Sequence, residues 1–108
     1  MSNVATVDVA FMDGRSYVIS IADGLLDDST ISTGVDASHA VVITEEAIVA
    51  LGPYGPFART IANLERRGIR VDTITFTGGE DRKTMATVME IMQQLYAVRG
   101  LDRKSMLV

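Results

Sequence analysis

The sequence predicts an α/β fold in which an N-terminal β-hairpin is followed by a βαβαβ unit with a parallel sheet. Near the start, apolar residues alternate with polar ones, which is the period of a strand covered on one face. Later apolar runs are continuous, as expected of parallel strands covered on both faces. Segments with apolar residues at helical spacing separate these runs, which is the order of a sheet with crossover helices.

The hairpin is predicted from two alternating segments and the turn between them. Residues 7–11 and 17–21 each place apolar side chains at every second position, so each strand is expected to bury one face. Asp13-Gly14 between them is a common hairpin turn. The polar segment 29–38 that follows is rich in small residues and is expected to form a loop.

The second part of the chain alternates strands and helices. Continuous apolar runs predict parallel strands, and apolar residues at helical spacing predict the crossover helices between them. The expected strands lie near 39–44, 69–76 and 105–108, and the expected helices near 56–67 and 84–99. In the second helix we expect methionines 85, 89 and 92 to fill the core. This order is half of a doubly wound, Rossmann-like fold.

Composition and charge limit the function. A length of 108 residues suits one small domain, and a net charge of −4 does not favour nucleic acid or an anionic membrane as a partner. The absence of cysteine excludes disulfides and thiolate metal sites. The chain shows neither a signal peptide nor an apolar run of membrane-spanning length, so we expect a cytoplasmic protein.

Two charged loops follow the first two predicted parallel strands. One contains Glu45 and Glu46, and the other is the segment TGGEDRKT at 77–84. Right-handed crossovers place both loops at the same edge of the sheet, where open α/β sheets bind ligands. The simpler interpretation is that these are solvated charges ahead of helices, where acidic side chains favour the helix dipole. Thr84 is the expected cap of the helix that follows.

No catalytic or metal-binding grouping stands out in the sequence. His39 is the only histidine, and it precedes a strand, so a role as metal ligand is disfavoured. We expect no Ser-His-Asp constellation and no catalytic residue in this chain. The chain stops inside the apolar run 105–108, from which we expect an incomplete domain, the N-terminal piece of a longer protein.

Several segments together resemble the N-terminal part of 3-dehydroquinate synthase and related sugar phosphate cyclases. The most specific is Gly-Glu-x-x-Lys between strand and helix, here Gly79, Glu80 and Lys83. The other segments are VVITEEAI, RRGIRVDTITF and GLDRKSMLV, and the resemblance extends from about Asp8 to Val108.

The resemblance implies a lyase that acts with NAD bound by its N-terminal domain. It also implies a divalent metal, zinc or cobalt, held by a helical C-terminal domain that residues 1–108 do not include. Dehydroquinate synthases convert 3-deoxy-D-arabino-heptulosonate 7-phosphate to 3-dehydroquinate, with loss of phosphate, in the shikimate pathway to the aromatic amino acids. Relatives cyclise other sugar phosphates, such as sedoheptulose 7-phosphate. Members of the family are homo-oligomers, so we expect self-association.

The resemblance also assigns residues. The cofactor-binding set that it implies is Glu45, Gly78, Gly79, Glu80, Asp81, Arg82 and Lys83. Glu45 stands where the family usually has aspartate, and Ala47 stands where asparagine is frequent. Two hypotheses follow. The chain is the NAD-binding part of a cyclase and inactive alone, or it is a stand-alone binding domain that has lost the chemistry.

Overall fold

The computed structural model describes residues 4–28 and 35–108. Strands β1 (Ala5–Ala10) and β2 (Ser16–Ile21) form an antiparallel hairpin, followed by the short 3-10 helix η1 (Leu25–Asp27). Most of the predicted loop at 29–38 lies outside the described residues, and residues 35–38 form no regular element. No helix in the described ranges is long and apolar enough to cross a membrane.

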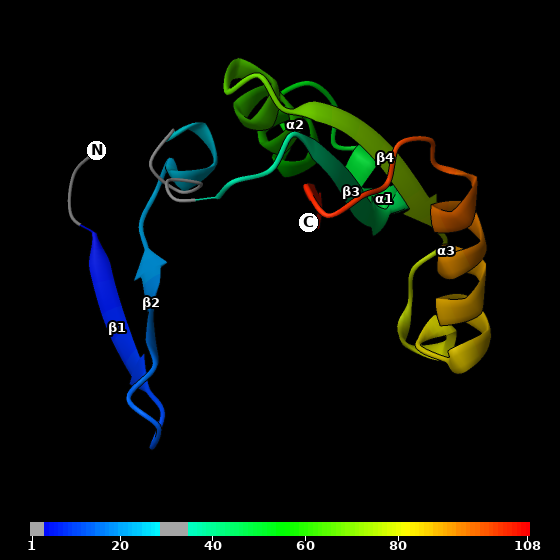
Figure 1. Cartoon of the computed structure of the whole chain (residues 1–108). Helices are drawn as coiled ribbons and strands as arrows, with labels where there is room; N and C mark the ends of the chain where they lie inside the picture. Colours follow the sequence, from blue (N-terminus) through cyan, green and yellow to red (C-terminus); the bar gives the residue numbers. More distant parts are fainter. Residues whose placement is uncertain (1–3, 29–34) are drawn as a thin grey trace.

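The rest of the chain forms the predicted parallel sheet with its helices (Figure 1). The strands are β3 (His39–Glu45), β4 (Arg70–Phe76) and β5 (Ser105–Leu107). The helical elements are α1 (Glu46–Val49), α2 (Pro56–Arg66), η3 (Glu80–Arg82) and α3 (Met85–Ala97). Because β3 pairs in parallel with both other strands, the predicted α/β fold with a hairpin and a parallel sheet is confirmed.

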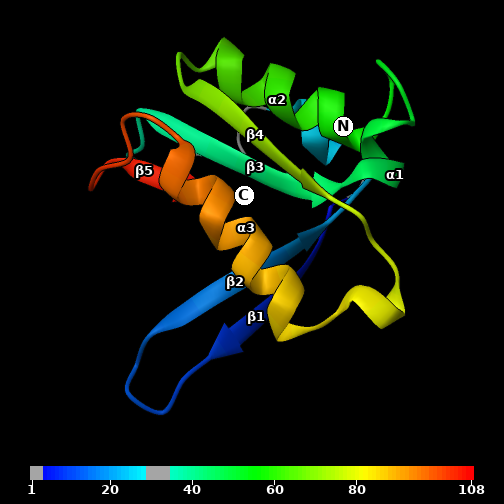
Figure 2. The ribbon, with the colours of Figure 1, turned by 90° about the vertical axis from the view of Figure 1, so that its right-hand side faces the viewer.

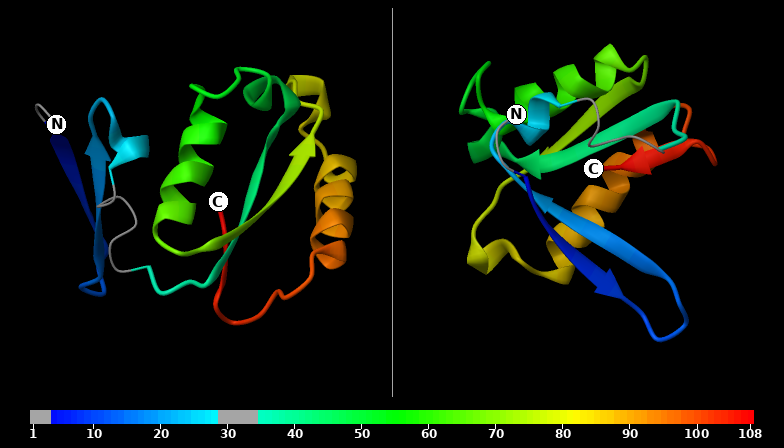
Figure 3. Two further views of the ribbon diagram at one scale, coloured as in Figure 1. Left: turned by 90° about the horizontal axis from the view of Figure 1, so that it is seen from above. Right: turned by 90° about the vertical axis from the view of Figure 1, so that its left-hand side faces the viewer.

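The strand order is β4-β3-β5, so the chain reverses direction across the sheet after β4. Helix α2 connects β3 to β4, and α3 then leads back to the other side of β3. The two helices cover opposite faces of the sheet, as the view from above shows (Figure 3). The carboxyl ends of β3 and β5 therefore mark the topological switch point of a doubly wound sheet.

Local sequence explains where the crossover helices begin and end. Pro56 occupies the first turn of α2, where its missing N–H needs no partner. Gly68 follows α2 with a φ of 78°, a conformation that glycine adopts without strain. The Thr84 hydroxyl accepts a hydrogen bond from Thr87 N–H (3.3 Å), which confirms Thr84 as the cap of α3.

The core is small and has a layer on each face of the sheet. Ala40 and Val42 of β3 pack with Leu64 and Ile69 on the α2 side. Val41 lies between them in sequence, and its side chain therefore points to the opposite face, where it is fully buried.

The expected burial of one hairpin face is wrong for the described residues. Cross-strand pairs Val7–Ile19 and Val9–Tyr17 do place apolar side chains on one face, as the alternation predicts. Val7 and Ile19 are nevertheless 49% and 43% exposed. The hairpin stands apart from the parallel sheet (Figure 1), so no other element within residues 4–28 and 35–108 forms a second layer over this face.

The expected role of the methionines is also wrong. Met85, Met89 and Met92 are exposed rather than buried. Helix α3 packs against β4, which is an outer strand of the sheet. The buried side chain that α3 contributes is Thr87. The apolar stripe that is identified by its helical spacing is therefore not on the side of α3 that contacts the sheet.

Candidate functional site

The two charged loops meet at the carboxyl edge of the sheet, as the sequence predicts. Glu45 is the last residue of β3 and lies opposite Phe76, the last residue of β4. Both strands end at the same level because they are parallel and in register. The loop beyond β4 then extends past the edge before the chain enters α3 (Figure 2).

Glu45 joins the two loops through its side chain. The side chain lies against the backbone of Gly78, so that a Cβ atom at position 78 would lie 2.7 Å from Glu45 Cγ and would overlap the carboxylate. Gly78 is therefore a point of close approach, which is what a residue without a side chain permits. Glu45 itself is half-buried.

Gly79, Glu80 and Lys83 form a tight turn. Gly79 has a φ of 118°, a region that side-chain-bearing residues rarely adopt, and it leads into η3. Lys83 Nζ donates to Glu80 Oε1 at 2.9 Å, and the two side chains are 68% and 88% exposed. An ion pair this exposed contributes little to stability, so both charges are free to exchange partners.

Asp81 and Arg82 lie on the outside of the same loop. The Asp81 carboxylate is close to Gly79, with Oδ1 3.0 Å from where a Cβ atom would be. The Arg82 guanidinium forms an ion pair with Glu90 of α3 at 3.6 Å. The structure thus brings six of the seven sequence-predicted site residues together in one loop and places the seventh, Glu45, against it.

A groove of about 470 Å³ lies between this loop, the end of β4 and the first turns of α3. Its lining is mostly apolar, with charged groups from the loop. The lining residues are Phe76, Arg82, Lys83, Thr84, Met85, Thr87, Val88 and Ile91.

The opposite edge of the sheet holds a polar cluster that the sequence did not predict. His39 is 3% exposed, and its Nε2 lies 2.6 Å from Asp72 Oδ2. Its Nδ1 lies 3.2 Å from Arg70 Nη2 and 3.5 Å from Ser105 Oγ. A serine, a histidine and an aspartate thus lie close together, although the sequence indicated no such neighbours for His39. We call His39, Arg70, Asp72, Ser105 and the Arg99 carbonyl the His39 cluster.

The His39 cluster does not have the geometry of a nucleophilic triad. A triad base must present a free lone pair to the serine hydroxyl. Here the Arg70 guanidinium, which can only donate, is closer to His39 Nδ1 than the Ser105 hydroxyl is. The cluster instead connects the first residues of all three parallel strands.

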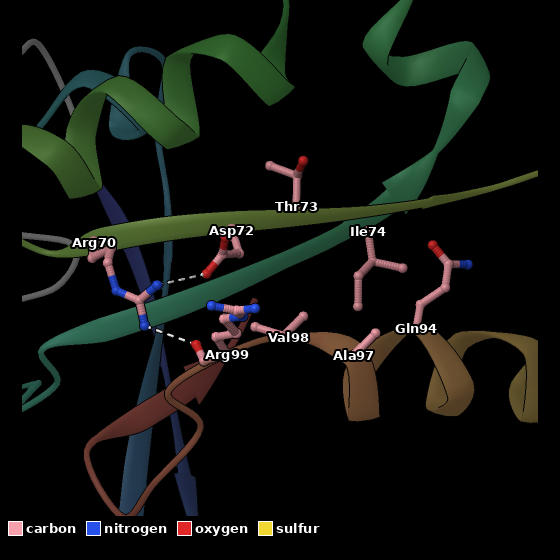
Figure 4. A pocket seen from close by; sticks show the side chains of 8 residues that line it. All are labelled: Arg70, Asp72, Thr73, Ile74, Gln94, Ala97, Val98 and Arg99. Atoms are coloured by element: carbon pink, nitrogen blue, oxygen red, sulfur yellow. Dashed lines mark hydrogen bonds and ion pairs between the residues drawn. The ribbon is translucent and has the colours of Figure 1, made fainter.

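A second pocket, of about 510 Å³, lies beside this cluster between β4 and the last turns of α3. Figure 4 shows Arg70 linking Asp72 to the Arg99 carbonyl at one end of it. The pocket is at the amino end of the sheet, away from the loop at 77–84.

Within residues 4–28 and 35–108, no group of three histidine, cysteine or acidic side chains could hold a metal ion. The clearest pKa shift is found away from the loop at 77–84. A hydrogen bond from Arg59 lowers the pKa of Asp27 and joins η1 to α2, with Nη2 2.6 Å from Oδ2.

Comparison with known proteins finds sequence similarity to two 3-dehydroquinate synthases. The chain is 30% identical to the 3-dehydroquinate synthase of a Synechococcus species over 100 residues, which is 90% of this chain and 26% of that protein. It is 32% identical to the 3-dehydroquinate synthase of Mesorhizobium japonicum over 105 residues, 95% of this chain and 26% of that protein. No protein-family model matches the chain.

Comparison with solved structures also finds similarity, at the level of the fold. Two structures of 2-deoxy-scyllo-inosose synthase match 95% of this chain at 18% identity, with TM-scores of 0.68 and 0.67. The second was solved with carbaglucose-6-phosphate, NAD+ and Co2+. The chain spans about a quarter of the length of these relatives. The resemblance to 3-dehydroquinate synthases and sugar phosphate cyclases is confirmed over this part of the enzymes.

Proposed function

We propose that this chain is the NAD-binding part of a sugar phosphate cyclase of the 3-dehydroquinate synthase type. The observation that carries the proposal is the contact of Glu45 with Gly78, which joins the two charged loops at the ligand-binding edge of the sheet. The sequence similarity to two dehydroquinate synthases supports it.

The residues at this edge fit a dinucleotide. Glu45 lies against the Gly78 backbone and so brings a further carboxylate to the point where the two loops meet. The neighbouring groove offers apolar walls for a ring. Glu80 supplies a carboxylate for ribose hydroxyls, and Lys83 supplies a mobile cation for a hydroxyl or phosphate. Because these two side chains already pair with each other, ligand binding would replace one charge-assisted contact with others.

Each residue then has a defined role. Glu80 accepts hydrogen bonds from sugar hydroxyls and so orients the bound cofactor. Lys83 donates to the cofactor from the same loop. Glu45 supports the loop by its contact with Gly78, and Asp81 and Arg82 shape the outer turn. When bound, NAD would supply reversible oxidation of a substrate hydroxyl.

The metal and the substrate-binding groups are proposed to lie outside these 108 residues. The described residues do not fit a divalent metal, because they contain no suitable group of ligands. The solved relative that contains NAD+ and Co2+ is a much longer chain, of which this one covers 27%. We therefore propose that residues 1–108 are the N-terminal NAD-binding domain fragment of a cytoplasmic homo-oligomer.

The proposed substrate of the whole enzyme is a heptulosonate phosphate of the shikimate pathway. The curated relatives at 30% and 32% identity favour it, since both are dehydroquinate synthases. The alternative is a cyclitol-forming relative that acts on sedoheptulose 7-phosphate or another sugar phosphate. We retain this alternative because the fold is similar to that of 2-deoxy-scyllo-inosose synthase.

Calorimetric titration with NAD, carried out on the proposed full-length enzyme, tests the cofactor assignment. Removal of Glu80 or Lys83, as Glu80→Ala or Lys83→Ala, should weaken NAD binding by roughly 1.5–3 kcal/mol, or about one to two decades in affinity. Asp13→Ala is the matched control, because Asp13 also belongs to an exposed ion pair, with Arg15, but lies in the hairpin turn. If both loop variants bind NAD as tightly as the parent protein, the loop is only an entry to α3.

A second measurement separates the enzyme part from a stand-alone binding domain. The 108-residue chain alone should release no phosphate from 3-deoxy-D-arabino-heptulosonate 7-phosphate, even with NAD and zinc. Phosphate release by a longer protein from the same gene would support the hypothesis that this chain is part of an enzyme. Phosphate release by the short chain above a heat-killed control would show that the catalytic groups are misassigned.

A further inference from the structure

The hairpin is attached to the rest of the described structure through η1 and α2. Strands β1 and β2 contact each other, and within residues 4–28 it is η1 that has extensive contact with an element of residues 35–108, namely α2. In the view from above, η1 lies against α2 while the two strands stand away from the sheet (Figure 3). The position of the hairpin therefore depends on how η1 is held.

The end of η1 presents three backbone carbonyls to groups outside the turn. Within the turn, Asp27 N–H donates to the Gly24 carbonyl at 3.1 Å. Asp28 N–H donates to the Leu25 carbonyl, also at 3.1 Å. These bonds occupy the first two carbonyls. The carbonyls of Leu26, Asp27 and Asp28 come after them, and the last carbonyls of a helix need partners from elsewhere.

Two side chains of α2 donate to these three carbonyls. Asn63 Nδ2 donates to the Leu26 carbonyl at 2.8 Å and to the Asp28 carbonyl at 3.0 Å. Arg66 Nη2 donates to the Asp27 carbonyl at 3.2 Å. Residues three positions apart lie on the same face of a helix, so both donors reach η1 from one side of α2. Helix α2 thus supplies the cap that η1 cannot form by itself.

Arg59 extends the same face of α2 by one turn, because it lies four positions before Asn63. Its Nε and Nη2 donate to the two carboxylate oxygens of Asp27, at 3.1 and 2.6 Å. This is the bidentate geometry in which arginine and carboxylate pair best. We call Arg59, Asn63 and Arg66 the α2 clamp. The clamp binds both the backbone and the side chain of η1.

Asn63 is the buried centre of the α2 clamp. It is 2% exposed, whereas the Arg59 side chain is 35% exposed. A carbonyl oxygen can only accept, so the amide must turn its NH2 group towards η1, and both of its N–H bonds are used there. Within residues 4–28 and 35–108, no donor reaches Asn63 Oδ1. A carboxylate at this position would keep the size of the side chain, lose both donors and place negative charge against two carbonyl oxygens.

We propose that the hairpin is an arm docked on the parallel-sheet unit by the α2 clamp, and that loss of the Asn63 contacts lets this arm move independently while the sheet stays folded. The core cluster that α2 forms with the sheet contains no residue of the hairpin. The hairpin strands are paired with each other and not with the sheet. No residue of the clamp belongs to the loop at 77–84, so this proposal does not depend on NAD binding.

Relaxation of the backbone amides, read by NMR on the full chain, tests the docked arm. It gives the rotational correlation time of the amides in β1 and β2 and of those in β3 and β4 within one sample. In the parent protein the two values should be equal. In Asn63→Asp the hairpin value should fall about twofold relative to the sheet value, because the arm then moves by itself on the nanosecond scale. The Ile43 N–H, which donates to the Val108 carbonyl at 2.9 Å, should keep its protection from hydrogen exchange and so report a folded sheet.

Two further variants make the test decisive. Gln93→Glu is the matched control, because it makes the same change from amide to carboxylate at an exposed position of α3, and it should keep the parent ratio of the two correlation times. Arg59→Met combined with Arg66→Met removes the outer donors and should lower the hairpin value by a smaller factor, which covers the case in which Asn63→Asp does not fold. A parent ratio in Asn63→Asp, or in the double variant where Asn63→Asp does not fold, would overturn the proposal. Loss of the folded sheet in both would also overturn it, because hairpin and sheet would then be one cooperative unit.

Discussion

Glu45 and Gly78 touch across the carboxyl edge of the sheet, the side chain of one lying on the backbone of the other. A Cβ atom at position 78 would be 2.7 Å from Glu45 Cγ and would overlap the carboxylate. Gly78 is not among the glycines with positive φ, so its backbone would tolerate alanine. The requirement for glycine at this position therefore comes from Glu45 and not from backbone strain.

Gly78→Ala should displace the Glu45 side chain while leaving the fold intact. The overlapping atoms belong to the outer part of a flexible side chain, which can rotate away at small cost in stability. We expect little change in the unfolding midpoint and about a tenfold loss of NAD affinity, since one charge-assisted contact or its support is lost. Thermal unfolding and NAD calorimetry on the same samples measure both.

The control for this prediction is a double-mutant cycle. If Gly78→Ala acts through Glu45, the variant that combines it with Glu45→Ala should bind NAD as Glu45→Ala alone does. Glu45→Asp should have an intermediate effect, because the carboxylate is drawn back by one methylene. Additive losses would show that the two residues act separately.

Thr84→Ala should destabilise the protein by about 0.5–2 kcal/mol, the usual effect of losing a helix cap. The Thr84 hydroxyl accepts from Thr87 N–H, and α3 then begins at Met85. Thr84→Ser keeps the hydroxyl and should restore most of the stability. Thr77→Ala is a control in the same loop. Urea unfolding measures all three, and equal stabilities for the alanine and serine variants would contradict the cap.

Low pH should remove the contribution of the Asp27–Arg59 ion pair to the stability of the folded state. The Arg59 hydrogen bond lowers the pKa of Asp27 below its ordinary value of 3.8. A carboxylate with a lowered pKa stabilises the folded state above its ordinary pKa, and this stabilisation is lost as pH falls through the lowered value. Asp27→Asn should therefore reduce the unfolding midpoint at neutral pH and make no difference at the acid end.

The pH comparison needs a second exposed ion pair as reference. Asp13→Asn removes the partner of Arg15, which lies within the hairpin turn and joins no separate elements. It should change the unfolding midpoint less than Asp27→Asn at neutral pH, because Asp27 connects η1 to α2. Equal effects of the two substitutions would show that the link between η1 and α2 adds nothing.

The periodicity of apolar residues predicts the helices and strands well, but it does not predict which of them lie next to each other in the fold. The strands at His39–Glu45 and Arg70–Phe76 and both crossover helices were predicted within one or two residues, because each is specified by local apolar spacing. The return of β5 to the far side of β3 was not predicted, since strand order depends on contacts between distant segments.

The same limit applies to burial and to the site. Alternation showed which face of the hairpin is apolar, but not that the face has no cover in the described structure. The loop at 77–84 could be placed at the sheet edge, because parallel strands align their carboxyl ends. The His39 cluster could not, since His39 and Ser105 are 66 residues apart and meet only through strand register.

We expect the chain to self-associate through its exposed apolar surface. The hairpin face exposes Val7, Ile19 and Tyr17, and helix α3 exposes a stripe in which Met85 is 75% and Tyr96 is 83% exposed. Contiguous apolar surface of this kind is unusual on a monomer and favours association by burial from water. Sedimentation at high micromolar concentration should show species larger than a monomer.

Neighbouring residues on one strand provide the matched control. Ile19 belongs to the apolar face of the hairpin and Ser20 to the polar face, because side chains alternate along β2. Ile19→Lys should shift the protein towards monomer, since it places a charge in the contact surface, whereas Ser20→Lys should not. Met89→Lys tests the helix stripe in the same way. A parent protein that sediments as a clean monomer, or equal behaviour of Ile19→Lys and Ser20→Lys, would exclude the hairpin face as the contact.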